Sequence, residues 1–380
     1  MKRDIVLTTT SELLFQIGDG SMNLFGIIFF YTLFKGSILL ATLPFIALHL
    51  IHSLLLPVIS PLLFKIGFKK SILIGAIFYS LACATLFLLN ENLNIGVLIL
   101  WASLYALGNV FHYVPIIYIL GYETKHATRG RTFSLRRIIF IAGAIVMPIL
   151  GGLISEYFGI TGLSVLCICF YILSFIPIIY ISDIEFLPGK TIFKTLFSKR
   201  GANIFLFKIS QVFSDGIGTV WPIFVFLVLS SSYENVGLVF TLVSFGSIII
   251  SYLIGFELDH HNRMKLYELS AITNFFAWLA RAISFNYISV LISDIIFRLN
   301  GDFRGTIMDV IDYDLMNDHI QKNRAGTIVL SEFIINMSVT VALTIGAILI
   351  SISSYQLSFI VIALIGFVLS LITKRFIKRG

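Results

Sequence analysis

Ionisable side chains that fall inside long apolar runs are the residues of this chain that could do chemistry. Asp19 lies somewhat before the middle of the run 12–34, and Asp215 lies near the middle of the run 204–230. A charge inside a membrane span is costly unless it faces a partner or a water-filled cavity. Each carboxylate could bind a coupling cation or carry a proton. The alternative role is a structural salt bridge or hydrogen bond to a neighbouring helix.

A stripe of alternating charge runs along the apolar stretch 287–312. Asp294, Arg298 and Asp302 recur at i, i+4 and i+8, so a helix would set them above one another on one face. Such a stripe cannot face lipid acyl chains. It either lines a central substrate cavity, pairs across an interface, or forms a structural ladder of ion pairs. Arg281, near the end of the preceding run, is expected to extend its charge toward the membrane surface.

A second polar face is expected on the stretch 95–121. Tyr105, Asn109 and His112 recur there at i, i+4 and i+7, and they could form the wall of the cavity opposite the charged stripe. His112 could relay a proton near neutral pH. The alternative for His112 is a hydrogen-bonded packing residue.

These residues need membrane helices to position them. The chain is 58% apolar with a mean hydropathy of +0.97, and only 12% of its residues are charged, against roughly 25% in soluble domains. A closed barrel would show short alternating strands instead of long apolar runs. The composition predicts an all-α membrane protein of about twelve transmembrane helices. The predicted spans are 12–34, 37–63, 71–90, 95–121, 137–157, 160–181, 204–230, 235–256, 265–285, 287–312, 326–352 and 355–373.

Positive charge lies mostly at alternate breaks between the spans. The net charge of +7 therefore indicates membrane orientation and no nucleic-acid partner. Under the positive-inside rule both termini lie in the cytoplasm, and the membrane is the cytoplasmic (inner or plasma) membrane. The basic groups are Lys2 and Arg3, Lys65 to Lys70, Lys125 to Arg137, Lys190 to Lys208, Arg263 and Lys265, Lys322 and Arg324, and Lys374 to Arg379.

The polar stretch 183–203 divides the chain into two related halves. It predicts a cytoplasmic linker between one six-helix bundle at 1–182 and another at 204–380. Two nearly equal offsets relate the halves. A shift of 196 lays Asp19 over Asp215 and Gly20 over Gly216, and a shift of 195 lays Arg129 over Arg324 and Gly151 over Gly346. A parallel duplication of this kind places a central site between halves that rock to expose it to each side in turn.

The loop from Gly255 to Lys265 resembles the G-x-x-x-D-R-x-G-R-K loop of the major facilitator superfamily. It carries Gly255, Asp259 and Arg263 at family positions, whereas the equivalent loop at 60–70 lacks the Asp. The resemblance implies that this is a gating loop, which tethers neighbouring helices at the cytoplasmic face. It also implies that Asp259 pairs with a nearby cation, either Arg324 or Arg263.

A second element, Met147-Pro148-Ile-Leu-Gly151-Gly152, is similar to the G-P-x-x-G-G element of exporters in the same superfamily, with Met in place of the first Gly. Its alternative reading is close helix packing, because small residues let membrane helices approach each other. By resemblance the fold is that of the major facilitator superfamily, with two six-helix pseudo-repeats.

We therefore expect a secondary active transporter of a small solute, working by alternating access and coupled to H⁺ or Na⁺. No phosphate-binding loop of the Walker type is present, and we expect no enzyme activity, no cofactor and a monomer in the lipid bilayer. No metal site is expected, since Cys83, Cys167 and Cys169 lack metal-ligand spacing. One alternative is a sensor or assembly factor that kept the fold without transport. Another is a membrane-embedded enzyme acting on a lipid.

Overall fold

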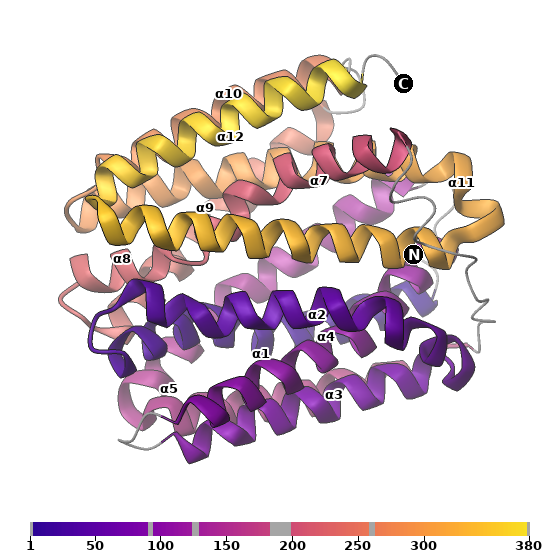
Figure 1. The fold of residues 1–380 in the computed structure, drawn as a ribbon, viewed down its shortest axis with the longest axis horizontal. Helices are drawn as coiled ribbons and strands as arrows, with labels where there is room; N and C mark the ends of the chain where they lie inside the picture. The colour runs from indigo at the N-terminus through magenta and orange to yellow at the C-terminus, as the bar shows by residue number, and fades with distance from the viewer. Residues whose placement is uncertain (1–2, 90–93, 124–128, 183–198, 258–262, 378–380) are drawn as a thin grey trace.

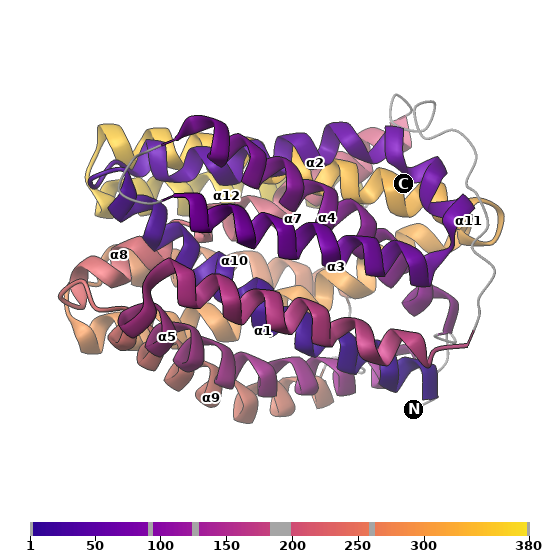
Figure 2. The same ribbon diagram turned by 90° about the horizontal axis from the view of Figure 1, so that it is seen from below.

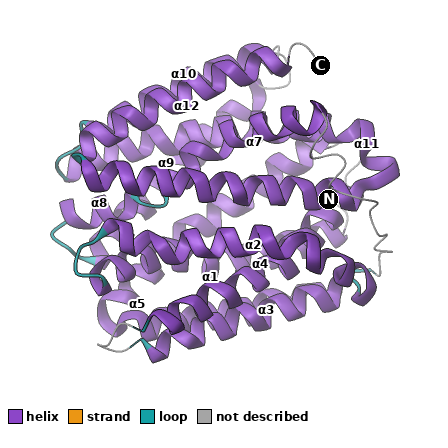
Figure 3. Ribbon diagram, in the orientation of Figure 1, coloured by secondary structure: helices purple, strands orange, loops and turns teal. Residues whose placement is uncertain are grey.

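The computed structural model describes residues 3–89, 94–123, 129–182, 199–257 and 263–377, and the regular structure in these ranges is helical, with no strand (Figure 3). The helices before residue 124 are α1 (Arg3–Leu33), α2 (Ile38–Ile66), α3 (Phe68–Thr85), η1 (Leu86–Leu88) and α4 (Ile95–Glu123). The helices after it are α5 (Arg129–Ile179), α7 (Lys199–Gly218), α8 (Trp221–Val228), α9 (Tyr233–Glu257), α10 (Arg263–Ala282), α11 (Tyr287–Ile352) and α12 (Tyr355–Ile377). The predicted all-α fold class is confirmed.

Two of the helices hold two predicted spans each. In α5, Gly159 has φ 61° and ψ −156°, a backbone conformation that glycine adopts readily, and the chain turns there between the spans 137–157 and 160–181. A straight α11 would be about 100 Å long at 1.5 Å per residue, far more than the ~30 Å hydrocarbon core. Its ribbon instead turns back near its middle (Figure 1). Eight helical runs in the described ranges are long and apolar enough to cross a bilayer.

The predicted span 204–230 corresponds to the apolar run Phe205–Val228, which is long enough to cross a bilayer, but it is not one continuous helix. It consists of α7 and α8, and Pro222 stands in the first turn of α8. Proline lacks the N–H that a continuous helix would need at this position, whereas the first turn of a new helix does not use it. The missing N–H of Pro222, which a hydropathy profile does not take into account, therefore explains why the helix is interrupted before this residue.

All the long helices run roughly along one axis of the bundle (Figures 1 and 2). We call the end where α1 begins and α12 ends the terminal end, on the right in Figure 1. The other end, which carries the turns at 34–37, 229–232 and 283–286, is the opposite end. Residues 183–198 of the predicted linker lie outside the described residues, and α7 already begins at Lys199. The division into two bundles at this linker stays a prediction.

Two helix pairs make the main contacts between the predicted halves. They are α2 with α11 and α5 with α9. The repeat offset maps α2 onto α9, and it maps the first part of α5 onto the second part of α11. Each pair is therefore the repeat of the other, as expected for two pseudo-repeats related by an approximate two-fold axis.

The contact between α5 and α9 is a close approach of backbones. A Cβ atom on Gly237 would lie 2.5 Å from the carbonyl oxygen of Pro148, and one on Gly152 would lie 2.7 Å from that of Tyr233. Near the same place, the Glu156 carboxylate accepts a 2.7 Å hydrogen bond from the backbone N–H of Tyr233, in the first turn of α9, where a negative charge is favoured. These contacts hold α5 and α9 together toward the opposite end.

This close approach predicts a position-dependent effect of alanine. We expect Gly237→Ala to lower the free energy of unfolding by about 1–3 kcal/mol, because the added methyl group forces two backbones apart. Gly246→Ala is the matched control in the same helix, since nothing lies within 4 Å of the added Cβ. It should be neutral or stabilising by up to about 1 kcal/mol. Thermal unfolding of the purified protein in detergent tests this, and equal effects of the two variants would contradict it.

Candidate functional site

Asp19 lies buried in α1, among neutral hydrogen-bond donors. Its side chain accepts a 2.5 Å bond from the Tyr105 hydroxyl of α4 and a 2.9 Å bond from the Asn23 amide, one turn further along α1. The Tyr171 hydroxyl of α5 lies 3.2 Å from that of Tyr105. In the described part of the chain, no cation forms an ion pair with Asp19. The site is therefore a buried carboxylate whose partners would all remain neutral when it ionises.

Aromatic rings surround this carboxylate. Tyr79 of α3 stacks on Tyr171 with ring centroids 4.8 Å apart, and its hydroxyl donates a hydrogen bond to Asn109. His112 stacks on Phe15 at 3.8 Å. The three polar residues that were expected to form one wall on α4 thus do different things. Tyr105 binds Asp19, Asn109 binds Tyr79, and His112 packs on an aromatic ring, all inside the first half of the chain.

A buried ion pair lies in the second half, near the opposite end. Arg281, in the last turn of α10, donates a 2.7 Å hydrogen bond to Asp294 of α11, and both side chains are about 95% buried or more. The guanidinium carbon lies 3.3 Å from the ring centroid of Phe297 and 4.4 Å from that of Trp221. Cation–π attraction in such a desolvated place adds to the ion pair.

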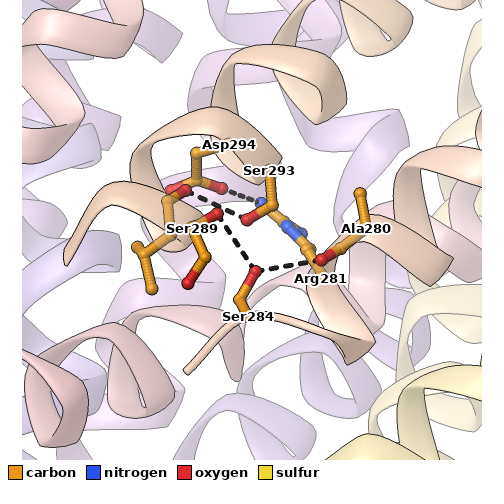
Figure 4. A network of polar contacts seen from close by, with 7 residues as sticks. Ala280, Arg281, Ser284, Ser289, Ser293 and Asp294 are labelled. Atoms are coloured by element: carbon orange, nitrogen blue, oxygen red, sulfur yellow. Dashed lines mark hydrogen bonds and ion pairs between the residues drawn. The ribbon is translucent and has the colours of Figure 1, made fainter. Parts of the chain in front are cut away.

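Serine side chains surround the turn that carries this pair (Figure 4). The Ser284 hydroxyl donates to the carbonyl oxygen of Ala280 and lies 3.2 Å from that of Ser289. Asn286 and Ser289 form a capping box that begins α11, satisfying backbone N–H groups that would otherwise lack partners. The capped turn therefore holds the end of α10 against the start of α11, which places Arg281 beside Asp294.

The expected charged stripe is corrected by these contacts. Asp294 pairs with Arg281 from α10 and not with Arg298 of its own helix, and Arg281 does not extend to the membrane surface. Arg298 is half-buried. The side chain of Asp302 lies outside the described part of the structure, as does that of Asp215. The described ion pair of Asp294 is with Arg281 of the neighbouring helix α10, so Asp294 does not belong to a ladder of ion pairs along one face of α11.

The predicted gating loop lies largely outside the described residues. Gly255 lies in the last turn of α9 and Arg263 begins α10, while Arg324 lies within α11. Asp259 is outside the described ranges, and the side chains of Arg263 and Arg324 are not described either. The ion pair between Asp259 and one of these arginines stays a prediction.

Sequence reasoning missed a polar group between α2 and α11. The Nδ1 atom of His49 lies 2.8 Å from Oδ1 of Asn336, and His52, one turn further along α2, is fully buried. The sequence feature that could have revealed this group is the i, i+3 spacing of two histidines in the largely apolar stretch 37–63. In the described ranges, no group of three or more His, Cys, Asp or Glu side chains is arranged to hold a metal ion.

The hydrogen bond to Asp19 can be tested by removing one hydroxyl group. We expect Tyr105→Phe to lower the free energy of unfolding by about 1.5–3 kcal/mol, the usual range for a hydrogen bond to a charged group. Tyr157→Phe is the control, because that side chain is 71% exposed and should change stability by less than about 0.5 kcal/mol. Denaturant titration in mixed micelles measures both. A Tyr105→Phe effect no larger than the control would refute the bond.

The ion pair predicts a larger and asymmetric effect. We expect Asp294→Ala to lower the free energy of unfolding by about 3–5 kcal/mol, because the buried guanidinium of Arg281 loses its counter-ion. Replacing both residues together, Arg281→Met with Asp294→Leu, should recover most of this loss. The Lys374–Glu268 pair, at 2.6 Å but partly exposed, provides the control. Glu268→Ala should cost less than about 1 kcal/mol, and an equal loss at both pairs would contradict the buried-pair argument.

Comparisons with known proteins identify the family of this chain. The family model described as Major Facilitator Superfamily matches residues 13–231, more than half of the chain. No curated protein sequence matches the chain. One similar solved structure is the "Crystal structure of a bacterial homologue of iron transporter ferroportin in outward-facing state". It is 15% identical, with a TM-score of 0.70, and the alignment covers 100% of this chain and 99% of that one.

At this identity the structural likeness shows the fold alone, and it extends over the whole chain. The family match comes from the sequence and covers the first half together with α7 and α8. Both agree with the helical architecture and the repeated interfaces described above. The chain therefore belongs to the major facilitator superfamily, and it is a multi-pass membrane transporter of a solute.

Proposed function

We propose that this transporter is secondary active and moves a small solute by alternating access, driven by a gradient of H⁺ or Na⁺. The observation that carries the proposal is Asp19, a buried carboxylate held by hydrogen bonds from Tyr105 and Asn23. A buried carboxylate has lost the water that would stabilise its charge. If no fixed cation is paired with it, it can bind a mobile cation or a proton instead. This is the property that coupling to an ion gradient requires.

The partners of Asp19 suit a reversible site. A hydroxyl and an amide can stabilise the charged carboxylate without neutralising it, so a cation that enters gains the full attraction of the charge. The Arg281–Asp294 pair differs, because each charge already has its counter-ion. We therefore assign ion binding to Asp19 and a structural role to Asp294, with Asp215 as the position to which the repeat maps Asp19.

The two interfaces between the halves support alternating access. A repeated pair of contacts, α2 with α11 and α5 with α9, allows one half to rock against the other about a central site. The remaining assignments rest on the charge pattern and the family. They are the cytoplasmic membrane as location, both termini in the cytoplasm, and a monomer as the working unit.

The solute is proposed only as a small molecule. The printed title of the similar structure names an iron transporter for that protein's relative, at 15% identity. The described residues of this chain offer no group of three or more metal-binding side chains. Iron is for these reasons tested as one solute among several and is not assigned as the substrate. The carboxylate of Asp19 and the polar and aromatic side chains around it favour a cationic solute or coupling ion.

The test uses the full chain reconstituted in liposomes with an imposed pH or sodium gradient. Uptake of a mixture of amino acids, sugars, nucleosides, organic amines and divalent metal ions is followed by mass spectrometry. We expect gradient-driven uptake of at least one solute by the wild type. Uptake of none under either gradient would favour the alternative of a sensor or assembly factor.

Asp19→Asn should abolish the dependence of uptake on the gradient, because the amide cannot exchange a charge or a proton. Asp4→Asn, in the first turn of the same helix and half-exposed, is the control and should behave as wild type. Asp215→Asn tests the repeat-related position. If Asp19→Asn leaves the gradient dependence unchanged, Asp19 is not the coupling site.

A further inference from the structure

The interface between α2 and α11 contains a polar group that the coupling proposal above does not use. His49 and His52 of α2 lie one helical turn apart, so they share a face of the helix, and Asn336 reaches them from α11. The ring nitrogen Nδ1 of His49 lies 2.8 Å from Oδ1 of Asn336. This bond crosses from one predicted half of the chain to the other, and it joins α2 to the second part of α11.

The hydrogen bonds of Asn336 determine which nitrogen of His49 carries a proton. Its amide Nδ2 donates a 2.8 Å bond to the backbone carbonyl of Glu332, so its Oδ1 must face His49. An amide oxygen only accepts hydrogen bonds, and Nδ1 of His49 is therefore the donor. The Nε2 atom is the one that gains or loses a proton when His49 titrates.

His52 is the more unusual member of the pair. It is 1% exposed, and neither ring nitrogen has a partner at good hydrogen-bond geometry, although the Asn336 amide of α11 lies close enough to interact with it. A polar group buried without a hydrogen bond is unfavourable, so this arrangement is not explained by stability. Protonation would add a charge and a second donor to the same closed surroundings.

Among the described residues, no acidic side chain forms a hydrogen bond with His52. In the described part of the chain, the ionisable group whose charge acts on His52 is His49, which is of the same sign when protonated. The helices packed around α2 are chiefly α11, α4 and α1. The buried or half-buried ionisable side chains that these helices carry include Glu332 on α11, His112 and Tyr113 on α4, and Glu12 and Asp19 on α1.

We propose that His52, together with His49, is the proton-binding site that couples pH to the opening of the α2–α11 interface. A protonated imidazole without a counter-ion is least stable while the interface is closed, and water stabilises it once the helices separate. Proton binding therefore favours the state in which α2 and α11 are apart, and proton release favours the closed state seen here. By linkage, opening the interface increases the affinity for the proton to the same extent.

This inference rests on the proposed secondary transport and deepens it, because it proposes H⁺ as the coupling ion and names His49 and His52 as residues that bind the proton. It also divides the work between two sites. The described hydrogen bonds of Asp19 come from residues of its own half. The His49–Asn336 bond joins the halves directly, which makes the histidine pair sensitive to their separation.

The test measures helix separation without requiring a known solute. Spin labels are placed on the exposed residues Leu43 of α2 and Ile348 of α11 through cysteine substitutions, in a Cys169→Ser background because Cys169 is exposed. Distances are compared by electron–electron double resonance in liposomes at about pH 6 and about pH 8, the range in which histidine titrates. We expect a larger population of the longer distance at the lower pH.

His52→Gln should remove this pH response, while Ser53→Ala, a neighbour at the same depth without a titratable group, should keep it. His52→Leu covers the case in which the glutamine variant fails to fold, because removing a side chain that makes no hydrogen bond of good geometry is expected to be tolerated. Absence of a pH response in the parent protein, or a response that persists in either His52 variant, would overturn the proposal.

A flux measurement separates this inference from the proposed function. Uptake in the liposome screen is compared at about pH 6 and about pH 8 for the wild type and His52→Leu. If no solute moves in any variant, the transport proposal fails, while the spin-label distances still decide the role of His52. If the wild type transports and His52→Leu keeps the same dependence on pH, transport stands and the histidine site is wrong.

Discussion

The absence of water from the bilayer core is the constraint on which the rest of this structure depends. Every backbone polar group must find its partner inside the chain, and helices meet this requirement over almost the whole described length. Many hydroxyl groups follow the same rule by bonding to a carbonyl one turn back, as Ser21, Ser53 and Ser338 do. The helix breaks then fall where this pairing fails, at Gly159 and before Pro222.

Buried charge obeys the same constraint, but the two halves meet it in different ways. The second half neutralises Arg281 with Asp294 and covers the pair with aromatic rings. In the first half, the described partners of the Asp19 carboxylate are neutral donors. The second half thus holds a paired charge, and the first half holds the carboxylate to which we assign cation binding. This difference is the physical basis for assigning ion exchange to the first half.

The two interfaces between the halves are related by the repeat and yet differ in chemistry. Gly237 and Gly152 bring the backbones of α9 and α5 together, and the repeat places Ala41 and Ala347 at the equivalent positions of α2 and α11. Small residues therefore recur in both. The histidines do not recur, because a shift of 196 lays His52 over Ile248. The histidine pair therefore belongs to the α2–α11 interface, whereas the described titratable group that bonds across the α5–α9 interface is the Glu156 carboxylate near its end.

Hydropathy and charge were enough to predict the helical fold class and about twelve spans, because each depends on residues close together along the chain. The family was predicted by the resemblance of short segments such as Gly255 to Lys265. Hydropathy and charge also singled out Asp19, since a lone carboxylate in an apolar run is conspicuous by itself. Hydropathy reports depth in the membrane but not the direction in which a side chain points. The partners therefore came only from tertiary packing, which brought Arg281 to Asp294, Tyr105 to Asp19 and Asn336 to His49.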